Sequence, residues 1–143
     1  MTSQLNKIPS WFKVIVIVLL IWNLMGVLNF AMQCTMTEAD ILTLPENQQI
    51  FYSEFTLLSK IAFAMGVFGG ALGCVALLAK KKIAMKLFWI SFIGIILQMN
   101  HNLGLANGGE MQSTIIGMSS LLIALTLLSI YLTKKAISNN WIK

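Results

Sequence analysis

The sequence contains no arginine, and charged residues make up only 10% of its 143 residues. Soluble domains typically carry about 25% charged residues, whereas 57% of this chain is hydrophobic. The composition therefore excludes a domain that is solvated on all sides and indicates a membrane protein in contact with a lipid bilayer. Arginine is also the residue that binds phosphates and base edges in bidentate fashion, so the net charge of +5 does not predict a nucleic-acid partner.

Residues that hold metals, cofactors or catalytic machinery are equally scarce. His101 is the only histidine, and the two cysteines, Cys34 and Cys74, form no CxxC pair. No Ser-His-Asp arrangement, phosphate loop or dinucleotide-binding glycine motif is present in the sequence. We therefore expect no enzymatic activity, no cofactor and no metal site.

The dominant feature of the sequence is a set of four long apolar segments. About 20 apolar residues cross a bilayer core, and helices satisfy their own backbone groups in lipid. The sequence therefore predicts four transmembrane helices, at about residues 12–32, 59–79, 83–100 and 113–133. A secretory signal peptide is the alternative for the first segment, but its apolar run continues past the length of a signal core and no small-residue cleavage pair follows.

The predicted fold class is an all-α membrane protein with a single domain, 1–143. Short turns between four spans favour an antiparallel up-down-up-down bundle. Outer loops are expected at 33–58 and 101–112, and the first should hold a short surface helix between spans one and two. Thr37 and Asp40 resemble a capping box for this helix, and Pro45 either ends it or begins another.

The distribution of charge predicts the orientation of the spans. Nine of the ten lysines lie before span one, between spans two and three, or after span four, and all five acids lie in the other two loops. The densest run is Lys80–Lys82 with Lys86, and Lys60 is the one lysine on the acidic face. Because positively charged loops stay in the cytoplasm, we expect a multi-pass protein with cytoplasmic N- and C-termini.

Small residues predict where the helices pack. Gly66, Gly69, Gly70 and Gly73 form overlapping small-xxx-small motifs on span two, which allow a second helix to approach closely. Gly117, with Ser120 and Ala124, forms a similar series on span four that could face those glycines. Packing within one chain is the first interpretation, and a homo-oligomer through the glycine face is the alternative.

Polar groups within apolar spans are the best indicators of a ligand site, because amides cost free energy in hydrocarbon unless they are paired. The hypothesis is an outward-opening pocket for a small polar solute, lined by Trp22, Asn23, Asn29, Gln33, Gln98 and His101. The alternative is that these amides only form hydrogen bonds between helices. No acidic residue lies within the spans, which disfavours proton-coupled pumping.

Several short stretches resemble a family of small bacterial four-helix inner-membrane proteins that are often labelled sugar transporters. These stretches are Ser10–Lys13, Trp22–Val27, Met32-Gln33, Leu44–Tyr52, Val67–Gly73 and Leu97–Met99. The resemblance covers nearly the whole chain and implies four spans in a bacterial cytoplasmic membrane and a sugar-type solute. There is a looser similarity of architecture to DoxX-like four-span proteins, which concerns the fold alone, and a redox-linked membrane protein of that kind is a second alternative. A non-catalytic accessory subunit of a larger membrane complex is a further alternative to a transporter.

Overall fold

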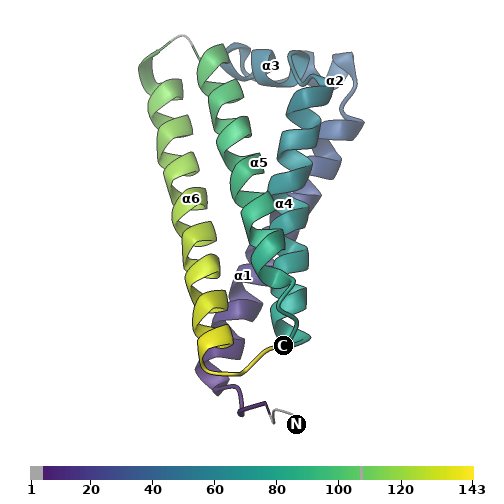
Figure 1. Ribbon diagram of the computed structural model, residues 1–143. Helices are drawn as coiled ribbons and strands as arrows, with labels where there is room; N and C mark the ends of the chain where they lie inside the picture. Colours follow the sequence, from purple (N-terminus) through teal and green to yellow (C-terminus); the bar gives the residue numbers. More distant parts are fainter. Residues whose placement is uncertain (1–4, 107) are drawn as a thin grey trace.

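The computed structural model describes residues 5–106 and 108–143, and within these ranges all regular structure is helical. The helices are α1 (Ser10–Thr35), α2 (Glu38–Leu42), α3 (Glu46–Ser53), α4 (Leu57–Leu78), α5 (Ala84–Leu105) and α6 (Gly109–Ser138). Figure 1 shows the four long helices running alternately in opposite directions, with the short α2 and α3 across one end. The all-α class is confirmed, and the outer loop holds two short helices where one was predicted.

Three of the long helices in the described part of the chain, α1, α4 and α6, have the length and apolar composition needed to cross a membrane. These three helices indicate a membrane protein, as the composition predicted. The fourth predicted span is not confirmed, because α5 carries Lys86 near its beginning and several polar residues near its end. The polar residues in its last turns are Gln98, Asn100, His101 and Asn102.

The short helices begin where the sequence predicted them to. The backbone N–H of Asp40 donates to Thr37 Oγ1 at 3.3 Å, and the backbone N–H of Thr37 donates to Asp40 Oδ2 at 2.9 Å. This reciprocal pair is the predicted capping box, and α2 begins directly after it. Pro45 then takes the N-cap position of α3, where the missing N–H of proline costs no helical hydrogen bond.

The long helices pack in the order α1, α4, α5, α6, and the series is not closed into a ring along its length. α4 packs against both α1 and α5, and α6 packs against α5. α1 and α6 approach each other at few positions: Figure 1 shows them converging at the end that holds both termini and diverging toward the other end. The regular four-helix bundle predicted from the sequence is therefore open on the side between α1 and α6.

We call the end that holds both termini the lysine end, because every lysine except Lys60 lies there. Its core is formed by α1, α4, α5, α6 and the C-terminal segment that follows α6. Phe12 and Leu77 are fully buried in this core, and Trp141 packs edge-on against Phe12 with ring centroids 5.2 Å apart. Backbone hydrogen bonds join the chain segments here, from Asn6 N to Asn140 O (2.9 Å) and between Lys143 and the lysine turn.

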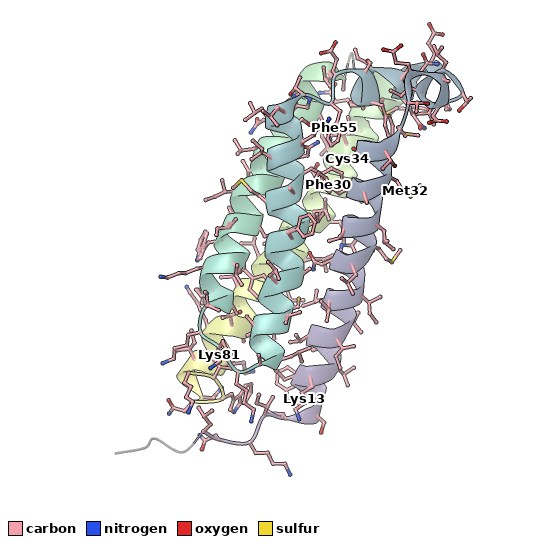
Figure 2. The ribbon with its side chains drawn as sticks, turned by 90° about the vertical axis from the view of Figure 1, so that its right-hand side faces the viewer. Lys13, Phe30, Met32, Cys34, Phe55 and Lys81 are labelled. Atoms are coloured by element: carbon pink, nitrogen blue, oxygen red, sulfur yellow. The ribbon has the colours of Figure 1, made fainter. Side chains whose placement is uncertain are left out.

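The opposite end, which we call the acidic end, carries α2, α3 and the acidic residues. Four aromatic rings cluster between α1, the segment before α4 and the first half of α4, with neighbouring centroids 5.5–6.5 Å apart. They belong to Phe30, Phe55, Phe63 and Phe68. Figure 2 places Phe30 and Phe55 toward this end, and Lys13 and Lys81 at the other.

Candidate functional site

The close contact of α4 with α5 forms one wall of the candidate site. A Cβ atom added to Gly69 would lie 2.9 Å from both the carbonyl oxygen of Leu87 and the backbone nitrogen of Ser91. A Cβ atom at Gly94 would lie 2.6 Å from the carbonyl oxygen of Ala62. The two backbones therefore touch where neither helix has a side chain, which is the packing that small residues permit in membranes. The hydroxyl of Ser91 adds a hydrogen bond to the carbonyl oxygen of Gly66, at 2.6 Å.

The other glycines of α4 make contacts with α1 as well as α5. The side-chain amide of Asn23 lies against Gly70, and the ring of Phe88 lies against Gly73 at 2.7 Å from an added Cβ. All four predicted packing glycines, Gly66, Gly69, Gly70 and Gly73, are buried within the chain. The glycine face is thus filled by α1 and α5, so it is not a free surface for a second copy of the chain.

Gly117 requires a correction. The sequence placed Gly117, Ser120 and Ala124 against the glycines of α4, but all three are exposed and a Cβ at Gly117 would meet nothing within 4 Å. The face of α6 that turns inward is a different one, rich in hydroxyl groups. Its buried polar residues are Ser119, Thr126, Ser129 and Thr133.

A cavity of about 310 Å³ lies between α1, α4, α5 and α6. Trp22 from α1, Phe88 and Ile95 from α5, and Leu122 from α6 supply apolar parts of its wall. Its polar lining comes from side chains on all of these helices except α4, which contributes glycine backbone. The main polar lining residues are Asn23, Ser91, Gln98, Asn102, Ser119 and Thr126.

Of the six residues predicted to line a pocket, three do so and three do not. Trp22, Asn23 and Gln98 line the cavity. Asn29 is exposed, and Gln33 is half-buried away from the cavity. His101 also lies outside the cavity lining, and its Nε2 is 3.2 Å from the carbonyl oxygen of Glu54, so it connects α5 to the end of α3.

Most hydroxyl groups of the lining are already engaged by their own helix. Thr126 and Ser129 donate to the carbonyl oxygens four residues earlier, at 2.8 and 2.9 Å. The amide nitrogen of Asn23 donates to Leu19 O at 2.8 Å. The hydroxyls of Thr126 and Ser129 have thus used their one donor and keep only acceptor lone pairs for a ligand, whereas Asn23 keeps its second N–H.

The amides near the acidic end keep more capacity. The hydroxyl of Ser59 donates to Gln98 Oε1 at 3.2 Å, and Gln98 Nε2 donates to Asn102 Oδ1 at 3.2 Å. Each amide nitrogen carries two N–H groups. This network therefore leaves one N–H of Gln98 and the amide nitrogen of Asn102 for a polar group in the cavity.

The predicted set of lining residues did not include Ser91, Asn102 or the hydroxyl face of α6. A signal for that face was present, because Ser119, Thr126, Ser129 and Thr133 recur at intervals of three, four and seven residues. The series Gly117, Ser120 and Ala124 has the same periodicity on the adjacent face. Nothing in the sequence alone decided between these two faces.

Within residues 5–106 and 108–143, no group of three His, Cys, Asp or Glu side chains is placed to hold a metal ion. Cys34 is exposed and Cys74 is buried, and neither forms a disulfide. Comparisons of the chain with known protein families, with curated proteins and with solved structures find no match.

Proposed function

We propose that all four long helices span the membrane, with α5 as the fourth span. The backbone of α5 touches that of α4 at Gly69 and Gly94, so a bilayer that surrounds α4 also surrounds α5. The polar residues that lower the hydropathy of α5 are turned inward in part, since Gln98 bonds to Ser59 and Asn102. Inward pairing removes most of the cost of placing these amides at membrane depth.

The lysine end belongs in the cytoplasm in this proposal, and the bilayer is the inner membrane of a bacterium. The clustering of lysines at one end, and of acids at the other, supports this orientation. A reporter enzyme fused after Lys143 tests it. Activity is expected only in the form that reports a cytoplasmic location, and activity of a periplasmic reporter at that position would refute the orientation.

The function that the cavity supports best is the binding and transport of a small molecule with an apolar body and one polar end. The observation that carries this proposal is a cavity of about 310 Å³ in which free amide N–H groups gather near one end. Its volume is about twice that of the ~150 Å³ apolar cavity that takes up benzene. It also lies at the lower end of the range of ligand pockets, roughly 300–1,000 Å³.

A sugar fits this lining less well than such an amphipathic molecule. A sugar needs hydrogen-bond donors and acceptors along its whole ring, whereas the hydroxyls of Thr126 and Ser129 already donate their only proton to backbone oxygens of their own helix. The open side between α1 and α6 also faces the lipid, so a lipid-soluble molecule can enter laterally. We therefore propose a ligand from the membrane phase in place of the sugar that the family resemblance implies.

A pair of adjacent serines on α6 provides the test. Ser119 is buried and lines the cavity, whereas Ser120 is exposed on the outward face. Ser119→Phe should fill the cavity with its ring, and Ser120→Phe should add the same ring to the lipid side. Small molecules that co-purify with the protein are then extracted and compared by mass spectrometry, with thermal unfolding as the check on folding.

The expected result is a small molecule present in the unmodified protein and in the Ser120→Phe variant, and depleted at least tenfold (about 1.4 kcal/mol) in a folded Ser119→Phe variant. Equal retention in both variants would refute ligand binding in the cavity. Protein that carries no small molecule, but co-purifies with the subunits of a larger complex, would favour the accessory-subunit alternative.

A further inference from the structure

Two helices end at the lysine end with the same backbone conformation but different residues. Lys80, after α4, and Asn140, after α6, have positive φ angles of 59° and 53°. Two hydrogen bonds close the end of α4, from Lys80 N to Leu77 O at 3.0 Å and from Lys81 N to Ala76 O at 2.8 Å. The matching pair at the end of α6 runs from Asn140 N to Ile137 O at 3.1 Å and from Trp141 N to Ala136 O at 2.9 Å. This is the Schellman arrangement, in which glycine is the usual residue at the positive-φ position and asparagine the next choice.

Lysine is a poor residue for this position. A β-carbon makes the left-handed conformation unfavourable, and the side chain of lysine, unlike that of asparagine, gives no local compensation. The two neighbouring lysines, Lys81 and Lys82, already provide positive charge for orientation. Backbone strain retained where glycine would remove it points to a role for the side chain itself.

The side chain of Lys80 borders a groove of about 200 Å³ between the beginning of α1 and the end of α4. Lys13 is the second charged residue of the groove, and the remaining lining is apolar. The apolar lining residues are Ile8, Phe12, Leu77 and Leu78. Ile8, Phe12 and Leu77 are buried, whereas Leu78 and, one turn earlier on α4, Val75 are exposed along the outside of the helix.

Two lysines among otherwise apolar lining residues match the chemistry of a phospholipid. The phosphate can be held between Lys13 and Lys80, and an acyl chain can lie along the exposed side chains of Leu78 and Val75. A soluble anion would gain nothing from the apolar part of the groove. The groove also lies at the membrane boundary, where α1 begins and α4 ends.

We propose that this groove is a binding site for one anionic phospholipid, with Lys13 and Lys80 as its phosphate partners. The site depends on the placement of the helices in a bilayer, and it is independent of any ligand in the central cavity. An anchored lipid would hold the lysine turn and the first turn of α1 at a fixed depth in the headgroup layer.

Lys80→Gly separates the structural role of this residue from the proposed one. Glycine adopts this positive φ without the steric cost of a β-carbon. The variant should therefore be at least as stable as the original chain in thermal unfolding. It also removes one phosphate partner. Asn140→Gly is the matched control, since it changes the same backbone position at the end of α6, and Lys134→Gln controls for the loss of one charge outside the groove.

The full chain is reconstituted in nanodiscs of phosphatidylcholine and phosphatidylglycerol, and the retained lipids are counted by native mass spectrometry. We expect one preferentially retained phosphatidylglycerol in the original chain and in both controls. Lys80→Gly and Lys13→Gln should each weaken this retention about fivefold, as expected for the loss of one lysine near the surface. Equal weakening by Lys134→Gln would overturn the proposal, because it would reduce the effect to overall charge.

Inorganic phosphate, added in excess, distinguishes the lipid from a soluble anion. Retention of phosphatidylglycerol should persist, because the acyl contacts along Leu78 contribute to binding. Full displacement of the lipid by inorganic phosphate would show an anion site without a lipid contribution and would overturn the proposal in this form.

Discussion

The lysine end of the molecule is closely packed, whereas the cavity begins at Phe88 and Ser129 and extends toward the acidic end, where the bundle is open. At the lysine end, α1 and α6 converge, and the C-terminal segment places Trp141 against Phe12. Toward the acidic end the same two helices diverge, and the space between them is bounded by hydroxyl and amide side chains. One end of the molecule therefore forms the closely packed core, and the other end holds the space that the proposed ligand would occupy.

The largest expected effect comes from removing one aromatic ring from each half. Phe12 is 1% exposed in the lysine-end core, and Phe30 is half-buried in the aromatic cluster of the acidic half. Phe12→Ala should lower the free energy of unfolding by roughly 3–5 kcal/mol, because it leaves a closed void. Phe30→Ala should cost about 1 kcal/mol, since lipid can fill the space that opens. Denaturation of both variants in detergent measures the difference, and equal losses would show that the two halves are equally important for stability.

The next effect concerns the contact of α4 with α5, which runs through both halves. Gly69→Ala places a methyl group against three backbone atoms of α5 and should cost roughly 1–3 kcal/mol, because backbone cannot move aside as a side chain can. Gly66→Ala is the matched control, since its added Cβ would lie 3.4 Å from a side-chain atom of Ile95. It should change stability by no more than about 0.5 kcal/mol. A large loss in the control, or none at Gly69, would mean that backbone contact does not hold this helix pair together.

The sequence predicted the positions of the long helices well, because apolar run length and lysine-rich turns are local features. It also predicted which residues of α4 would pack, since glycines at intervals of three and four residues leave only one face of the helix without side chains. The length of the pocket along α1 was not predictable. Trp22, Asn29 and Gln33 share one side of α1, but only Trp22 of the three lines the cavity, and α1 diverges from α6 toward the acidic end.

That divergence depends on the angles between helices, which result from the summed packing of many side chains. Hydrophobic periodicity describes one helix at a time, so it gives the faces of α6 but not the partner of each face. Ser119 and Gly117 were equally suitable by this measure, and only the contact with α5 placed Ser119 inside. The site was therefore predictable as a set of polar residues in apolar helices, and unpredictable as an enclosed volume.

The smallest expected effect is confined to the acidic end and depends on pH. Hydrogen bonds from the hydroxyl and the backbone N–H of Thr37 hold the pKa of the Asp40 carboxyl below its ordinary value of 3.8. A lowered pKa in the folded state means that the cap stabilises α2 fully above pH 3.8 and loses this contribution as pH falls through the lower, folded value. Carboxyl NMR should therefore give a midpoint for Asp40 below 3.8, and Thr37→Val should return it toward that value.

Since Asp40 is exposed and distant from the lysine-end core, acidification should release α2 while the contact of Trp141 with Phe12 persists. Simultaneous loss of both would contradict the independence of the two halves.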